Sequence, residues 1–136
     1  MRNSLYSISG DSVPDFAVEQ VDKTGVPYVF YPEQNGVVAG KQYNATIVAN
    51  YAIDYYKKIL NTKDTSAKEK FNNCLSWLSN NLTSTNTYGL YVFNWQQPWY
   101  DSVGTPFTSG MTSGLTLQAF TLAMHSKASG RFNEDA

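Results

Sequence analysis

The sequence predicts a mainly helical fold with a short β-type segment at its N-terminal end. Two stretches with apolar residues at helical spacing follow each other closely, at 44–60 and 67–82, and a third covers 109–126. Residues 1–42 show no helical period. A hydrophobic content of 42% and a charged content of 15% are typical of a chain that folds around a core.

Residues 1–42 are expected to form an extended arm or a hairpin. Residues 25–32, GVPYVFYP, are a short β-type run between a glycine and a proline. Behind it, Asn35 and Gly36 form the strongest turn signal in the chain. We therefore treat 1–42 as an arm and 43–136 as the helical unit.

The first two helices should form an antiparallel hairpin over 44–82, because their connection is short. Asn44 is a favourable N-cap for the first, and Ser66 with Glu69 predicts a capping box for the second. The apolar face of the first helix is Val48, Tyr51, Ala52, Tyr55 and Ile59. The apolar stripe of the second is Ala67, Phe71, Cys74, Leu75, Leu78 and Leu82.

Residues 83–106 are polar and aromatic, and we expect an aromatic hairpin there. Tyr91, Phe93 and Trp95 alternate with the non-aromatic residues Val92 and Asn94, which is typical of a strand. One interpretation is a wall that stacks on sugar rings, with Trp95, Trp99 and Tyr100 as its candidate contacts. The other interpretation is a hairpin that only packs on the helices.

The third helix, 109–126, carries apolar residues around most of its circumference: Met111, Leu115, Leu117, Phe120, Leu122, Ala123 and Met124. Such a helix should have neighbours on several sides, as in the inner layer of a multi-layer helical assembly. Residues 131–136 resemble the start of a further helix. We therefore expect the fold to continue, or a second chain to supply the missing walls.

Composition excludes several classes of function. A net charge of -1 gives no electrostatic reason to bind nucleic acid or an anionic membrane. No apolar run is long enough for a membrane span and no leader follows Met1, so a cytoplasmic protein is the default, with a secreted parent left open. One cysteine, Cys74, permits no internal disulfide, and no metal-ligand spacing occurs. The lone histidine, His125, is expected at the surface.

Several segments, in this order, resemble the C-terminal domain of the D-glucuronyl C5-epimerase family, which acts on heparosan-type polysaccharides. They cover roughly residues 24–136: the run from GVPYVFYP to the end of the first helix, then KEKFNNCLSWLSNNL, YGLYVFNW, PFTSGMTSGLTLQAFTLA and SGRFNEDA. The resemblance implies an (α/α) toroid, with helical hairpins around a sugar-binding cleft, of which this chain is the front part.

The resemblance also implies which residues contact substrate. Ser109, Met111 and Gly114 keep the pattern of a family segment that lines the cleft, whereas the two glutamines of that segment are replaced by Ser113 and Leu115. The family's catalytic tyrosines and acidic residue lie in later helices, so no catalytic residue is assigned here. The implied partner is a polysaccharide that contains uronic acid, and the incomplete toroid implies a homo-oligomer.

Three functions remain open. C5 epimerisation removes a proton next to a carboxylate and returns one to the opposite face, which needs two acid–base groups and no metal or organic cofactor. The first alternative is a non-catalytic carbohydrate-binding or assembly module. The second is another toroid enzyme, a lyase or glycoside hydrolase, but Asp101 is the lone acidic residue in 83–126, and a hydrolase needs two carboxylates.

Overall fold

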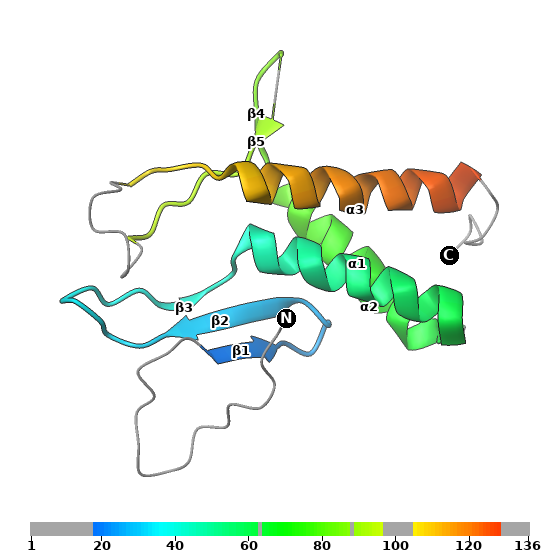
Figure 1. The fold of residues 1–136 in the computed structure, drawn as a ribbon, viewed down its shortest axis with the longest axis horizontal. Helices are drawn as coiled ribbons and strands as arrows, with labels where there is room; N and C mark the ends of the chain where they lie inside the picture. Colours follow the sequence, from blue (N-terminus) through cyan, green and yellow to red (C-terminus); the bar gives the residue numbers. More distant parts are fainter. Residues whose placement is uncertain (1–17, 63, 88, 97–104, 129–136) are drawn as a thin grey trace, which may run out of the picture.

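The computed structural model describes residues 18–62, 64–87, 89–96 and 105–128. This part of the chain is mainly helical with short antiparallel strands, as predicted. Figure 1 shows the strands β1, β2 and β3 on one side of helix α1, helix α2 behind it, and helix α3 on the opposite side, where β4 and β5 also lie. The elements are β1 (Val18–Val21), β2 (Pro27–Tyr31), β3 (Gly40–Gln42), α1 (Ala45–Thr62), α2 (Thr65–Asn80), β4 (Thr83–Ser84), β5 (Gly89–Leu90) and α3 (Gly110–Ala128).

The arm is a three-stranded antiparallel sheet of order β1-β2-β3, in which Val18 lies opposite Phe30 and Phe30 opposite Lys41. Asn35 and Gly36 have positive φ values of 53° and 78°. Both positive values are those of a type I′ turn, the geometry that the Asn-Gly pair favours. The β-type run and the turn are therefore confirmed.

Gly25 connects the sheet to the helical hairpin. Its φ is +91°, and a Cβ at this position would lie 2.4 Å from Cγ of Lys70 on α2. Its carbonyl oxygen accepts a hydrogen bond of 2.8 Å from the Tyr55 hydroxyl on α1 and a longer one, 3.8 Å, from the Cys74 thiol on α2. Glycine is required here both for the backbone conformation and for the close approach.

Helix α1 begins as predicted, because the Asn44 carboxamide oxygen accepts from the Thr46 amide at 2.9 Å. Its buried surface is wider than the predicted stripe, since Ala49, Ile53 and Tyr56 are buried as well. Helix α1 packs against α2 and β2, and α3 also lies against it. A helix with neighbours on several sides buries more than one stripe, and in the described part of the chain α1 has this role.

Helix α2 starts two residues earlier than the capping box predicts, and that prediction is wrong. The N-cap is Asp64, whose Oδ1 accepts from the Ser66 amide at 2.9 Å and from the Ser66 hydroxyl at 2.8 Å. The hydroxyl of Ser66 is thus a donor to a stronger cap and does not cap the helix itself. The predicted stripe is otherwise confirmed, with Ala67, Phe71, Cys74 and Leu78 buried.

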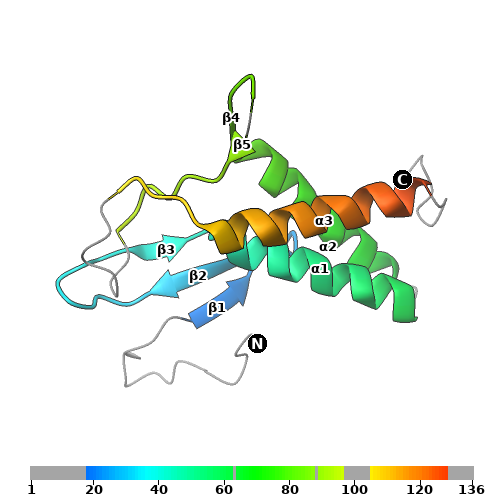
Figure 2. The ribbon, with the colours of Figure 1, turned by 45° about the horizontal axis from the view of Figure 1, so that its top comes forward.

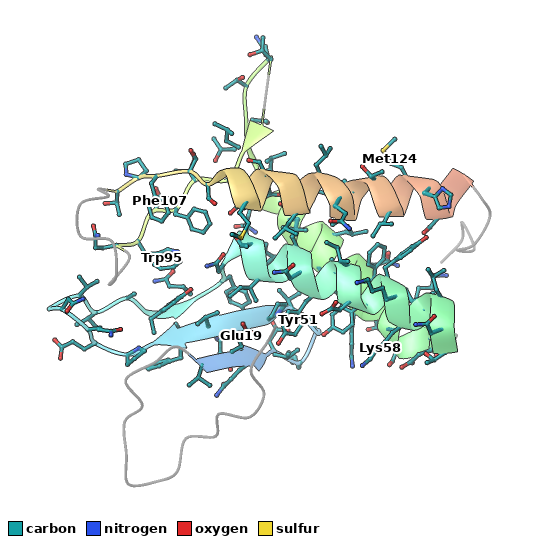
Figure 3. All side chains as sticks on the ribbon, in the orientation of Figure 1. Glu19, Tyr51, Lys58, Trp95, Phe107 and Met124 are labelled. Carbon is teal, nitrogen blue, oxygen red and sulfur yellow. The ribbon has the colours of Figure 1, made fainter. Side chains whose placement is uncertain are left out.

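Among the described residues, helix α3 has one main neighbour, and the further neighbours expected on its other sides stay a prediction. It packs mainly on α1 and has few contacts with α2 (Figure 2). Met111, Leu117 and Met124 are 68%, 68% and 72% exposed, and Met124 points away from the other helices in Figure 3. The buried positions are instead Thr112, Thr116, Ala119 and Ser126.

Two further expectations concern residues 131–136 and the possibility of a membrane span. The helix start expected at 131–136 lies outside the described residues. None of the helices in the described ranges combines the length and the apolar character that crossing a membrane requires.

Candidate binding groove

A groove of about 270 Å³ lies where the end of β3, the C-terminal end of α2 and the segment 91–95 meet. Five of its lining residues are aromatic: Tyr43, Trp77, Tyr91, Phe93 and Trp95. Four are polar and uncharged: Gln42, Asn81, Thr83 and Asn94. Its volume is just below the ~300–1,000 Å³ of typical small-molecule sites, which suits a short part of a longer ligand.

A larger hollow, of about 430 Å³, follows the C-terminal half of α1. All of its lining residues come from this one helix, between Tyr51 and Thr62. The hydroxyls of Tyr51 and Tyr55 there already donate to Glu19 and to the carbonyl of Gly25. Because three separate elements converge on the smaller groove, we take that groove as the candidate site.

Aromatic contacts hold two walls of the groove in place. On one wall, the rings of Tyr43 and Trp77 stack with centroids 5.9 Å apart and planes at 27°. On the other, Trp95 lies 4.8 Å from the ring of Tyr31 and edge-on to Phe93 at 5.9 Å. These distances are typical of stable aromatic pairs, so both walls are pre-formed.

The wall that contains Trp95 is tied to the start of α3. Phe93 and Phe107 exchange backbone hydrogen bonds of 2.8 and 3.0 Å, and their rings stack at 4.9 Å. Trp95 and Phe107 accordingly lie close together in Figure 3. Tyr91 and Phe93 are buried while Asn94 is exposed, but the segment makes only an isolated bridge between Phe93 and Phe107. The strands β4 and β5 pair in a short hairpin that ends before the aromatic residues, and the expected aromatic hairpin over 83–106 stays a prediction.

Two of the three amide side chains that line the groove are held by backbone carbonyls. Nε2 of Gln42 donates to Ala39 O at 2.8 Å, and Nδ2 of Asn81 donates to Trp77 O at 2.8 Å. Asn81 is also the C-cap of α2, since its backbone N–H donates to the same carbonyl at 3.1 Å. The identity of each amide nitrogen follows from its carbonyl partner.

The tyrosine hydroxyls of the groove are already engaged. Tyr43 donates to Oδ2 of Asp22 at 2.8 Å, and Tyr91 donates to the carbonyl of Leu78. Burial and the neighbouring Asp22 raise the pKa of Tyr43 to about 12, and burial raises the pKa of Tyr91 to about 12. Burial opposes ionisation of Asp22, but hydrogen bonds from Thr24, Tyr43 and Val26 outweigh it and lower its pKa.

The structure brings one predicted site residue to the groove and places three others elsewhere. Trp95 lines the groove. Ser109 accepts from the Thr112 amide at 3.4 Å, which makes it the cap of α3. Met111 and Gly114 are exposed on α3. None of these three lines the groove. Trp99 and Tyr100 lie outside the described residues.

Tyr43 and Trp77 line the groove but were not predicted from the sequence. Trp77 is a large aromatic residue that lies beside the apolar stripe of α2 and is only half-buried. A tryptophan displaced from the core stripe of an amphipathic helix is a usable signal for a surface site. Tyr43 offered no such signal, because it directly precedes the helix cap.

Other reactive groups stay apart from the groove. Cys74 is buried in the core, and burial raises its thiol pKa to about 12. His125 is exposed on α3. In the described ranges, His, Cys, Asp and Glu side chains form no group of three or more that could hold a metal ion.

Comparisons with models of known protein families, with curated proteins and with solved structures found no match for this chain. The fold and the groove therefore define only a class: a mainly helical chain with a small antiparallel sheet and an uncharged aromatic groove.

Proposed function

We propose that this chain is a non-catalytic carbohydrate-binding module and that its ligand occupies the groove between Trp77 and Trp95. The observation that carries the proposal is the composition of the groove, five aromatic rings with uncharged polar side chains at its rim. The apolar C–H face of a sugar ring packs on an aromatic ring, while the sugar hydroxyls exchange hydrogen bonds with amides and hydroxyls.

The state of the groove tyrosines favours binding over catalysis. Tyrosine can abstract a proton at neutral pH only when its pKa is lowered. The pKa values of Tyr43 and Tyr91 are raised to about 12, and both hydroxyls already donate to fixed acceptors. Neither tyrosine is therefore suited to act as the acid–base group of an epimerase in this groove.

The second candidate is part of a polysaccharide-modifying protein that resembles glucuronyl C5-epimerase, within an (α/α) toroid. The order of the elements supports it, since a helical hairpin is followed by the short pair β4–β5, then by an aromatic segment that begins at Tyr91, and then by α3. The exposed Met111, Leu117 and Met124 suit an inner helix that awaits further neighbours. Deuterium uptake at C5 of a glucuronan in D2O tests this candidate, and binding without uptake rejects it for this chain.

The expected homo-oligomer stays a prediction. The native mass of the purified chain tests it, with 15.2 kDa as the mass of one chain. An assembly larger than one chain is the expected result.

Binding is tested by titrating a panel of neutral and uronate oligosaccharides into the purified chain and measuring affinity by calorimetry. Trp95→Ala and Trp77→Ala should each weaken binding about tenfold or more, equivalent to ~1.4 kcal/mol. Phe30→Ala is the matched control, because Phe30 is an exposed aromatic residue on β2 that does not line the groove. Thermal unfolding of each variant separates lost contacts from lost folding. No binding to any member of the panel would reject the proposal.

A further inference from the structure

We infer that the groove selects neutral sugar rings over uronates, through hydrogen-bond acceptors at its rim and the negative end of α2. This inference rests on the proposed carbohydrate binding and names the substrate class of that site. It differs from the uronate that the family resemblance implies.

The side-chain amides of Gln42 and Asn81 are fixed in orientation at the groove. The NH2 groups of Gln42 and Asn81 already donate to the carbonyls of Ala39 and Trp77. Each NH2 group has two N–H donors, so each of these amides keeps one N–H as well as its oxygen for a ligand. A sugar hydroxyl both donates and accepts and can use both groups, whereas an ionised carboxylate only accepts and can use the N–H alone.

The groove also lies at the C-terminal end of helix α2. Trp77 and Asn81 belong to the last turn and the C-cap of α2, and both line the groove. The last carbonyls of a helix give its C-terminal end a partial negative charge. The last turn of α2 contains no basic residue that would offset this charge. The helix end thus disfavours an anionic ligand independently of the amides.

The described charged side chains around the groove also offer no cation to an anionic ligand inside it. Among the described residues, no lysine, arginine or histidine lines the groove. The carboxylate of Asp22 lies 2.8 Å from the Tyr43 hydroxyl. The ammonium of Lys41 lies over the rings of Tyr28 and Tyr43, 4.3 and 5.6 Å from their centroids. Lys41 therefore lies against aromatic faces and is not one of the lining residues.

Thr83 and Asn94 complete the rim, and they fit the same ligand. A hydroxyl and an amide can both donate and accept. A neutral sugar presents hydroxyls that do the same, so it can satisfy all four polar side chains. A carboxylate can use only the donors among them, and it leaves the amide oxygens of Gln42 and Asn81 without a donor.

The test compares matched tetrasaccharides with β-1,4, β-1,3 and α-1,4 linkages, each as the neutral glucan and as its C6-carboxylated counterpart. Affinities are measured by calorimetry at about pH 7 and low salt, where electrostatic effects are largest. We expect the neutral member of the bound pair to bind at least tenfold more tightly than the carboxylated member.

Three variants sharpen the test. Gln42→Ala and Asn81→Ala should each weaken neutral binding about three- to tenfold, and Asn80→Ala is the control, since Asn80 is exposed and does not line the groove. Asn81→Lys places a cation at the helix end and should strengthen binding of the carboxylated member about tenfold. Equal or tighter binding of that member to the wild-type chain would overturn the selectivity while leaving carbohydrate binding intact. Binding of neither member in any pair would overturn both.

Discussion

Helices α2 and α3 both pack on α1, yet their fully buried positions differ. The 16 residues of α2 bury Phe71, Cys74 and Leu78. The 19 residues of α3 bury Thr112, Thr116, Ala119 and Ser126, bury Leu115, Phe120 and Leu122 only in part, and expose three large apolar side chains. The difference teaches that apolar content alone does not identify the buried face of a helix. A clean stripe does so, whereas a helix that is apolar all round leaves the choice to its neighbours.

The largest expected effect on the free energy of unfolding separates the buried apolar side chains of α2 from the exposed apolar side chains of α3. Phe71 is fully buried and packs on Tyr56 with ring centroids 5.6 Å apart and planes tilted by 49°, so Phe71→Ala should lower the free energy of unfolding by about 3–5 kcal/mol. Leu117 is 68% exposed, so Leu117→Ala should change it by less than about 0.5 kcal/mol. Urea unfolding measures both. Equal losses would mean that α3 is covered in solution and would remove the contrast.

The second effect tests the close approach of α3 to α1. Ala119 has no exposed surface. Ala119→Leu should therefore destabilise the chain by about 1–3 kcal/mol, because a buried side chain that is too large forces the helices apart. Gln118→Leu is the control, since Gln118 is exposed on the same helix. A neutral Ala119→Leu variant would show that the two helices are not closely packed.

The third effect compares two buried threonines of α3. The hydroxyls of Thr112 and Thr46 are hydrogen-bonded, whereas the hydroxyl of Thr116 is buried without a partner. Thr112→Val should cost about 0.5–1.5 kcal/mol, and Thr116→Val should be neutral or stabilise by up to about 1 kcal/mol. The two melting temperatures should therefore move apart. A loss of equal size at both sites would mean that Thr116 has found a partner.

The smallest expected effect is the pH dependence of stability that comes from the N-cap residues of α2 and α3. Hydrogen bonds from the side chain and backbone of Ser66 lower the pKa of Asp64, the cap of α2, below its ordinary value of 3.8. Its stabilisation is therefore fully present above that value and is lost as the pH falls through the lowered pKa. Asp64→Asn keeps the acceptor without the charge, so wild type should lose its advantage over this variant in acid. Ser109, the cap of α3, does not titrate, and the effect of Ser109→Ala should not change with pH.

The sequence by itself determined the local features of this protein. Asn44 as a cap, the Asn35-Gly36 turn and the stripe from Ala67 to Leu78 each depend on residues close together in the chain, and the structure confirms all three. The capping box failed for a local reason too, since the Asp64 carboxylate caps the helix two residues earlier and accepts from both the amide and the hydroxyl of Ser66, which then lies inside the first turn. Trp95 was found in the same way, by alternation along one short segment.

Only the tertiary structure decided which face of α3 is buried and which aromatic residues share a groove. The buried face of α3 is the one that meets α1, where Ala119 has no exposed surface, whereas Met124 lies on the exposed side. The groove depends on Tyr43, Trp77 and Trp95 meeting from three elements that lie far apart in the sequence. Such meetings are set by packing over the whole core, because the periodicity of one segment carries no information about its distance from another.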